Sequence, residues 1–168
     1  MTNTNYKTIA SKIKFEGRAF INGKYVDAID GEKFETINPA TGETLCSVAK
    51  CNSKDVDLAV KVSRKAFNSG VWSRTSPEFR KDVLLKFAEL LRSHGVENSV
   101  LECIDTGKLI GDCINEVAND APMHFQWYGE LIDKVFGKVG PTEPSLTSLI
   151  VKEPIGVIAG VVPWNFPL

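Results

Sequence analysis

The end of the chain holds the residues best suited to chemistry. It reads Val161-Val162-Pro163-Trp164-Asn165-Phe166-Pro167-Leu168. The rings of Pro163 and Pro167 fix their own φ and hold the residues before them extended, so the pattern predicts a stiffened turn that presents Asn165. Loops that follow the carboxyl ends of strands bind ligands in open α/β sheets. The segment therefore indicates either a ligand-binding loop or a structural turn flanked by prolines.

The cysteines and histidines do not have the spacing of a metal site. They form no C-x-x-C pair and no set of zinc ligands: Cys46, Cys51, Cys103, Cys113, His94 and His124. A reactive thiolate needs a nearby cation or a helix N-terminus, and the sequence marks neither clearly beside Cys103 or Cys113. We therefore expect reduced structural thiols, and simple thiol chemistry is the weaker alternative.

Composition limits the partners. The 168 residues are 43% hydrophobic and 24% charged, with 20 Lys+Arg against 21 Asp+Glu, as in one soluble globular domain. This balance offers no basic surface for nucleic acid and no cationic block for an anionic membrane. The longest apolar stretch, residues 155–164, is half the length of a spanning helix, which needs about 20 residues. We expect neither nucleic acid nor membrane as a partner, and a cytoplasmic location because residues 1–15 lack a secretory signal.

Short strands joined by turns are predicted for the first fifty residues. The pair Asn22-Gly23 lies between two β-prone runs and is typical of a tight hairpin, because both turn residues must adopt positive φ. Turns at 30–31 and 38–43 separate further runs at 34–37 and 44–49. We expect a β-meander here.

Helical periodicity follows the predicted strands. Four helices are expected: residues 55–69, residues 77–93 after a Ser76 cap, residues 96–105 and residues 110–135. The buried stripe of the second would contain Phe79, Val83, Phe87, Leu90 and Leu91. Pro122 lies inside the fourth helix, where its ring crowds the carbonyl of Ala118, so we expect a kink or a break there.

The last predicted elements place the ligand loop on a sheet. Residues 137–147 have the composition of a connector, and residues 148–152 that of a strand. Residues 155–162 show no polar alternation, which predicts a strand buried on both faces of a parallel sheet. The predicted fold class is therefore α/β. Such a strand needs neighbours, and no βαβ unit fits after Leu168, so we interpret the chain as the front part of a larger fold.

Four segments resemble the aldehyde dehydrogenase superfamily in order and spacing. They are Phe20-Ile21-Asn22-Gly23, residues 38–43, residues 102–108 and Pro163 to Leu168. The resemblance implies an incomplete Rossmann-like coenzyme-binding domain, interrupted by a β-arm used for oligomerisation. It implies an N-terminal extension over residues 1–19, a partial NAD(P)-binding domain over 20–133 and 155–168, and part of the arm over 134–154. A catalytic domain is absent from these residues.

The resemblance also implies the chemistry. In the family a cysteine thiolate attacks an aldehyde, hydride passes to NAD or NADP, with NAD favoured here, and a glutamate activates water to hydrolyse the thioester. Asn165 matches the family's oxyanion donor. An amide suits this role, since a fixed amide stabilises an oxyanion without the cost of a buried charge. Val162, Pro163 and Trp164, together with Asn165, match positions that line the cofactor cleft. Phe166 matches a wall of the aldehyde channel.

A cation site is implied near the predicted strands. Asp105, with the backbone carbonyls of Thr36 and Ile37, resembles a monovalent-cation site of some family members. Oxygen ligands suit a hard cation. The alternative is a carboxylate that caps local backbone groups.

Several motifs of the family pattern are not found in this sequence. None of its cysteines lies in a segment like the nucleophile motif, and the catalytic glutamate and the cofactor-phosphate loop would follow Leu168. Residues 70–73, 76–77 and 127–134 look most like γ-glutamyl-γ-aminobutyraldehyde and related aminoaldehyde dehydrogenases of polyamine breakdown. We expect part of an NAD(P)-dependent aldehyde dehydrogenase, acting on a small aldehyde, inactive alone and homo-oligomeric when complete. The alternative is a non-catalytic association module that pairs with a separate C-terminal half.

Overall fold

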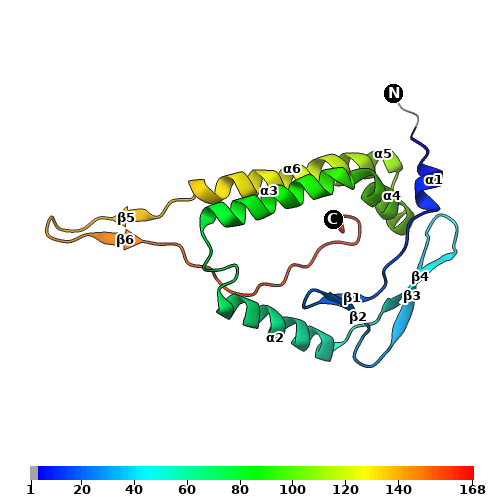
Figure 1. The fold of residues 1–168 in the computed structure, drawn as a ribbon, viewed down its shortest axis with the longest axis horizontal. Helices are drawn as coiled ribbons and strands as arrows, with labels where there is room; N and C mark the ends of the chain where they lie inside the picture. Colours follow the sequence, from blue (N-terminus) through cyan, green and yellow to red (C-terminus); the bar gives the residue numbers. More distant parts are fainter. Residues whose placement is uncertain (1–3) are drawn as a thin grey trace.

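A pair of helices packed side by side forms the centre of the fold. The computed structural model describes residues 4–168, and in it α3 (Pro77–Ser93) and α6 (Ala121–Leu131) pack side by side (Figure 1). Helix α4 (Gly95–Thr106) and the short α5 (Ile110–Cys113) lie at one end of this pair. Helix α2 (Ser53–Ser69) lies apart from it, and the C-terminal segment crosses the space between them. The C-terminal segment thus runs between the helix pair and α2 (Figure 1).

The predicted hairpin near the N-terminus is confirmed. After a short helix α1 (Tyr6–Ala10), strands β1 (Ala19–Ile21) and β2 (Lys24–Val26) pair antiparallel. Asn22 and Gly23 connect them with φ of 56° and 73°. These are the positive values that a tight hairpin turn requires of both residues.

The next two strands form a sheet of their own. Strands β3 (Lys33–Ile37) and β4 (Thr44–Ala49) pair antiparallel, with a bulge between Thr36 and Ile37. Within residues 4–168 β2 does not pair with β3, so the prediction of one continuous meander is wrong. The segment that connects β2 to β3 is instead held by Asp55. The Asp55 carboxylate accepts hydrogen bonds from the backbone N–H of Ile29 and Asn52, each at 2.9 Å. This buried carboxylate fixes the connection to the start of α2.

The helix boundaries follow the capping signals closely. Ser76 accepts a hydrogen bond from the N–H of Phe79 at 3.2 Å, and Pro77 takes the first helical position, where no N–H partner is needed. Asn52 and Asp55 form a reciprocal capping box at the start of α2. The predicted second and third helices are confirmed to within about one residue.

Pro122 does interrupt the long fourth helix, as predicted. Between α5 and α6 the chain forms a π-helix, η1 (Ile114–Asp120), in which the N–H of Ala121 donates to the carbonyl of Glu116. A 3-10 turn, η2 (Ile132–Lys134), ends the run. The wider π turn accommodates the proline, which lacks an N–H and would crowd the carbonyl of an ordinary α turn.

The buried core is small and lies where α3, α4, α5 and η1 meet. Its apolar members include Ala88, Leu91, Val100, Cys113 and Val117. Ser99 is also fully buried, and its hydroxyl donates toward the carbonyls of Gly95 at 2.7 Å and Cys113 at 3.1 Å. This pairing removes the cost of burying a hydroxyl in an apolar core.

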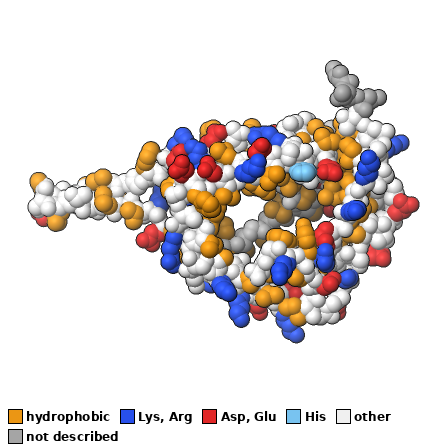
Figure 2. All heavy atoms as spheres, viewed as in Figure 1, with side chains coloured by type: hydrophobic (Ala, Val, Ile, Leu, Met, Phe, Trp, Pro, Cys, Tyr) orange, Lys and Arg blue, Asp and Glu red, His pale blue; other side chains and the backbone are white. Residues whose placement is uncertain are grey.

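Much of the predicted apolar stripe of α3 is exposed. Leu91 is buried, but Phe79, Val83, Phe87 and Leu90 keep 40–49% of their surface accessible. The chain exposes 12632 Å² in total, against about 8,200 Å² expected for a compact monomer of this mass. Figure 2 shows hydrophobic side chains around the opening between the helix pair and α2. The stripe therefore lacks an element to cover it within the described residues.

The last predicted elements are only partly present. Strands β5 (Lys138–Gly140) and β6 (Ser148–Ile150) form a hairpin that projects from the body, so part of the predicted connector is a strand (Figure 1). Residues 155–162 are not a buried strand: Val161 is 96% exposed and Val162 64%. A parallel strand forms only beside strands that accept its hydrogen bonds, and residues 4–168 provide none here. Across the same residues, no helix has both the length and the apolar character needed to cross a membrane.

Candidate functional site

Asn165 lies in a short turn near the end of the chain. The N–H of Phe166 donates to the carbonyl of Pro163 at 3.2 Å and closes this turn. Asn165 is half-buried, whereas the flanking Val162, Trp164 and Phe166 remain exposed. The prolines thus produce the predicted turn, although the strand expected before it is absent.

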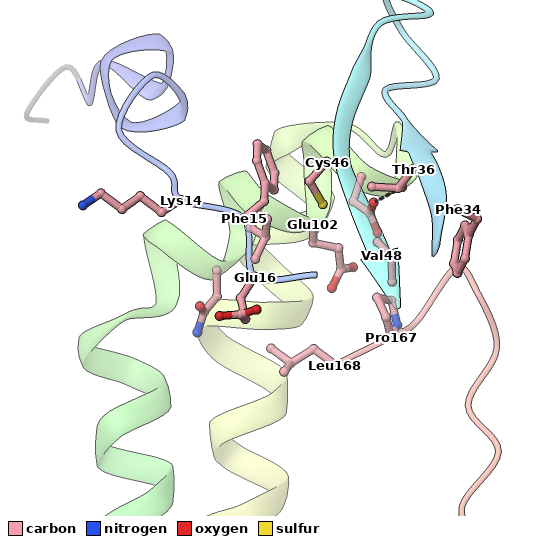
Figure 3. Close-up of a pocket in the computed structure, with 13 residues that line it drawn as sticks. Lys14, Phe15, Glu16, Phe34, Thr36, Cys46, Val48, Glu102, Pro167 and Leu168 are labelled. Carbon is pink, nitrogen blue, oxygen red and sulfur yellow. Dashed lines mark hydrogen bonds between the residues drawn. The ribbon is translucent and has the colours of Figure 1, made fainter. Parts of the chain in front are cut away.

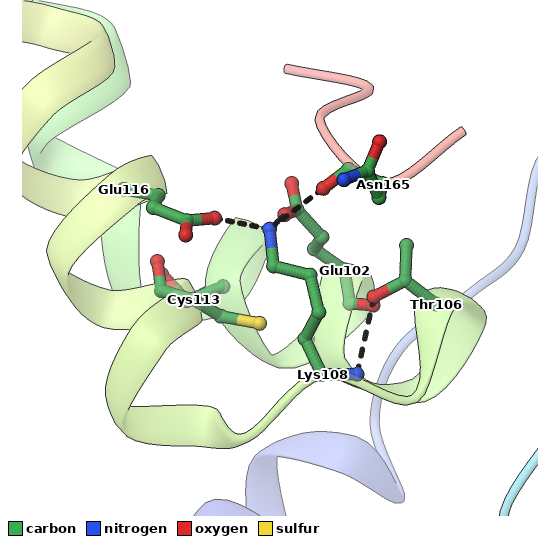
Figure 4. Close-up of polar contacts among 7 residues, drawn as sticks. Glu102, Thr106, Lys108, Cys113, Glu116 and Asn165 are labelled. Atoms are coloured by element: carbon green, nitrogen blue, oxygen red, sulfur yellow. Dashed lines mark hydrogen bonds and ion pairs between the residues drawn. The ribbon is translucent and has the colours of Figure 1, made fainter. Parts of the chain in front are cut away.

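Lys108 holds this turn from the helical body. Its Nζ lies 3.0 Å from the backbone carbonyl oxygen of Asn165 and 2.6 Å from Oε1 of Glu102 (Figure 4). It also pairs with the carboxylate of Glu116 and lies 4.5 Å from the centre of the Phe166 ring. Two segments separated by 57 residues are therefore joined through one ammonium group.

The end of α4 positions Lys108. Thr106 is the last helical residue, and its hydroxyl donates to the carbonyl of Glu102 at 2.7 Å. Gly107 follows with φ 76°, and a Cβ there would lie 2.8 Å from Cγ of Pro39. A glycine suits both the positive φ and this close approach. The sharp turn brings the Lys108 side chain back along α4.

The charges at this cluster are mostly buried. The Lys108 side chain is 17% exposed and that of Glu102 only 6%. Burial lowers the pKa of Lys108, but the hydrogen bonds that its ammonium donates to Glu102 and Glu116 outweigh it, so the pKa is raised overall. Lys108 is thus a permanent cation at neutral pH, enclosed by two carboxylates.

The side chains of Thr36 and Asp105 meet at a second place. The Thr36 hydroxyl donates to Oδ1 of Asp105 at 3.1 Å. Both residues line a cavity of about 680 Å³, together with Cys46, Pro167 and Leu168 (Figure 3). Among residues 4–168, no group of three or more His, Cys, Asp or Glu side chains could hold a metal ion. A cation here would therefore depend on backbone and hydroxyl oxygens besides Asp105.

Three of the thiols have pKa values unsuited to nucleophilic attack. Burial raises the pKa of Cys113 to about 11, and it also raises the pKa values of Cys46 and Cys51. A nucleophilic cysteine needs a lowered pKa, from a cation or a helix N-terminus. The raised pKa values at these three positions are thus the opposite of what a nucleophile needs, and structural thiols stay a prediction.

Comparison with known proteins decides the family. Residues 25–168 match the model of the aldehyde dehydrogenase family. The chain belongs to the aldehyde dehydrogenase family. The resemblance identified from the sequence is confirmed.

The relatives of this aldehyde dehydrogenase chain are much longer than the chain. It is 44% identical over 159 residues to the NADP/NAD-dependent aldehyde dehydrogenase PuuC of Escherichia coli, covering 95% of this chain and 32% of that protein. It is 41% identical over 168 residues to an aminoacetaldehyde dehydrogenase of Pseudomonas aeruginosa, covering 100% of this chain and 34% of the relative. The chain thus spans about a third of the length of these curated relatives.

Solved aldehyde dehydrogenases share the fold. An indole-3-acetaldehyde dehydrogenase of P. syringae, in complex with NAD+ and IAA, matches with a TM-score of 0.94 and 42% identity, covering 97% of this chain and 33% of that one. A γ-glutamyl-γ-aminobutyraldehyde dehydrogenase of Burkholderia cenocepacia matches with a TM-score of 0.93 and 44% identity, covering 96% and 33%. The predicted fold class, an incomplete α/β N-terminal part of the coenzyme-binding domain, is confirmed.

Sequence reasoning missed the cluster that holds the turn. The segment Glu102 to Lys108 resembles the aldehyde dehydrogenase superfamily, but the sequence predicts no role for Lys108. Only the fold brings its ammonium group to Asn165 and Phe166. The signal available was a Thr-Gly-Lys sequence at a helix end, which predicts a cation turned back on the helix but not its partner.

Proposed function

We propose that this chain is the N-terminal portion of an NAD(P)-dependent aldehyde dehydrogenase that oxidises a small aldehyde to the carboxylate, with NAD as the favoured cofactor. The observation that carries the proposal is the family match over residues 25–168, which ends on the turn presenting Asn165. A relative named for NADP/NAD dependence and a solved relative in complex with NAD+ support the cofactor class.

The proposed division of the chain follows its elements. Residues 20–133 and 155–168 would form part of the coenzyme-binding domain, after an extension over residues 1–19. Residues 134–154 would begin the oligomerisation arm. The hairpin β5–β6, which projects from the body, supports this arm and a homo-oligomeric complete enzyme (Figure 1). A cytoplasmic location without nucleic-acid or membrane partners stays part of the proposal.

Asn165 would stabilise the oxyanion formed when a thiolate attacks the aldehyde carbonyl. Within residues 4–168 its backbone carbonyl accepts from Lys108, while its side-chain amide makes no hydrogen bond. That amide is thus available to donate to a developing negative charge. A cation at this position would instead stabilise the thiolate itself, and stabilising the ground state adds nothing to the rate of the chemical step.

The neighbours of Asn165 would serve the cofactor and the substrate. Val162, Pro163 and Trp164 present an exposed apolar surface that suits one wall of a nicotinamide cleft. When bound, the cofactor would accept a hydride, and these side chains would exclude water around it. Phe166 would form a wall of the aldehyde channel. The Gly-x-Gly-x-x-Gly turn that holds a pyrophosphate in other dinucleotide sites does not occur in this sequence.

Two finer assignments are also proposed. The substrate would be an aminoaldehyde, as in polyamine breakdown, because two relatives above 40% identity carry aminoaldehyde names. A monovalent cation would bind Asp105 and the carbonyls of Thr36 and Ile37. The Thr36 hydroxyl already lies 3.1 Å from Asp105, which supports the site but equally supports a purely local hydrogen bond.

A non-catalytic association module is the second candidate. The observation in its favour is the accessible surface, which exceeds the compact expectation by about half. Such a module would use its apolar helix face and its hairpin to pair with a separate C-terminal half. Only the first candidate requires the side-chain amide of Asn165 to act in chemistry.

Fusion of this chain to the C-terminal two thirds of the 44% identical relative tests the proposal. We expect NADH formation from an aminoaldehyde by the fusion and none by the 168-residue chain alone. The intact relative is the positive control. A folded fusion that forms no NADH, or aldehyde oxidation by the chain alone, would contradict the proposal.

Calorimetric titration of the chain alone with NAD should give a dissociation constant in the millimolar range or weaker, about -4 kcal/mol at best.

A further inference from the structure

The cluster around Lys108 uses every donor of one ammonium group. A lysine has three N–H donors, and here the three acceptors are the carboxylates of Glu102 and Glu116 and the carbonyl of Asn165. Two of these partners belong to the helical body and the third to the turn. The arrangement is a tripod that joins the turn to the body.

The same ammonium group contacts the next residue of the turn. The Phe166 ring centre lies 4.5 Å from Nζ, within the range of a cation–π contact. Lys108 thus contacts both residues of one peptide bond. It binds the Asn165 carbonyl and lies against the Phe166 ring. Fixing that peptide leaves the Asn165 side chain few directions to take.

The carboxylates explain why the ammonium group stays in place. Glu102 is on the penultimate turn of α4, and Glu116 is on the π-helix η1, so each holds Nζ from a different element. Both contacts are charge-assisted and largely shielded from water, and such hydrogen bonds are stronger than exposed ones. Glu116 also belongs to the π turn itself, because its backbone carbonyl accepts the hydrogen bond from the N–H of Ala121.

We propose that Lys108, held between Glu102 and Glu116, is a positioning residue that fixes the Asn165–Phe166 peptide and so aims the Asn165 side-chain amide at the reacting carbonyl. The inference rests on the proposed function of Asn165. A compact ammonium suits the task better than a guanidinium, because three divergent acceptors fit three rotatable donors and not a planar fork.

The first test measures the turn in the 168-residue chain itself. The variant Lys108→Met keeps an unbranched side chain, one atom shorter, and removes the charge and the three donors. We expect the amide of Phe166 to exchange with solvent about 10- to 100-fold faster, the loss of one charge-assisted hydrogen bond. Lys81→Met is the matched control, because Lys81 pairs with Asp133 at 2.7 Å and makes no hydrogen bond to the turn. Unchanged exchange at Phe166 would overturn the proposal.

A second variant keeps the test valid if Lys108→Met does not fold. Lys108→Met leaves two largely buried carboxylates unpaired, which is costly. The triple variant Glu102→Gln, Lys108→Met, Glu116→Gln removes all three charges together. It should fold and still show the faster exchange at Phe166. Protection equal to the wild type in this variant would refute a role for the ammonium group.

The third test measures catalysis in the fusion to the relative's C-terminal part. Lys108→Met should lower kcat about 10- to 100-fold and leave the KM for NAD within about threefold, because only the aim of the oxyanion donor changes. Lys108→Arg should recover part of the loss. If Asn165→Ala abolishes turnover but Lys108→Met does not, positioning by Lys108 is wrong while the role of Asn165 stands. If neither Asn165→Ala nor Lys108→Met lowers turnover, although Lys108→Met still speeds exchange at Phe166, the proposed catalytic role of Asn165 is wrong.

Discussion

Gly95 lies directly against Ala118, and there is no room for a side chain between them. A Cβ on Gly95 would lie 2.7 Å from the Cβ of Ala118 and 2.9 Å from its Cα. Gly95 begins α4 and Ala118 belongs to η1. This contact sets how closely the π-helix approaches α4, and therefore where Glu116 stands relative to Lys108.

Gly95→Ala should destabilise the fold by about 1–3 kcal/mol, the usual cost of overpacking. Gly111→Ala is the matched control, because a Cβ there meets nothing within 4 Å. Since Gly111 lies in α5, the control should be neutral or stabilise by up to about 1 kcal/mol. Urea unfolding monitored by circular dichroism measures both. Equal stability of the two variants would mean that α4 and η1 are less closely packed than described.

Asn165→Ala in the fusion enzyme should lower kcat about 10²–10³-fold, the usual loss of one oxyanion donor. Cofactor affinity should change much less, because the amide meets negative charge only after thiolate attack. Asn165→Asp should be worse, since a carboxylate repels both thiolate and oxyanion. Steady-state and single-turnover kinetics check this. Near-full turnover in the Ala variant, with chemistry limiting the rate, would return Asn165 to a structural turn residue.

Acid should weaken the contact between α3 and η2, the turn that follows α6. Hydrogen bonds from Lys134 and Lys81 lower the pKa of Asp133 to about 2 from its ordinary 3.8. A lowered pKa stabilises the folded state above pH 3.8, and this contribution is lost as the pH falls toward 2. Asp133→Asn should therefore shrink the difference in urea midpoint between pH 5 and pH 2.5. Asp112→Asn is the control, because Asp112 makes no ion pair within the described residues. Identical pH profiles for Asp133→Asn and the wild type would refute the assignment.

The isolated chain should self-associate through the exposed face of α3. Phe79 and Leu90 are 49% and 48% exposed, and exposed apolar surface of this kind recruits partners. The double variant Phe79→Gln, Leu90→Gln should reduce both light scattering and the binding of a hydrophobic dye without unfolding the chain. Leu91→Gln, at a buried position of the same helix, should unfold it instead. A monomeric wild type with a cooperative melt and no dye binding would contradict this prediction.

Local signals predicted the local structure well. Asn22 with Gly23, the Ser76 cap with Pro77, and Pro122 each act over a few residues, so their effects depend on nearby backbone alone. The segment 155–162 shows the limit. Its apolar sequence predicts a buried strand, but burial and pairing need strands that residues 4–168 do not include. The same reason explains why the α3 stripe is exposed.

The site was predictable only in part. The two prolines indicated the turn that presents Asn165, whereas the cation site implied for Asp105 and the carbonyls of Thr36 and Ile37 stays a prediction. The contact of Lys108 with Asn165 could not be predicted, because it depends on where two distant segments meet in space. No local pattern of residue types records such a meeting.

The π-helix gives this part of the chain a residue to spare. Each π-type hydrogen bond spans five residues instead of four, so η1 holds more chain than an α-helix of the same number of turns. Loss of one residue from Ile114–Asp120 would therefore favour regular α geometry with the same number of turns, and α6 would keep its facing toward α3. Phe125 would still lie against Phe87, whose ring centre it meets at 4.7 Å. A single-residue deletion should therefore be tolerated far better within this segment than within the regular α-helix α3, where it would turn the following residues by about 100°.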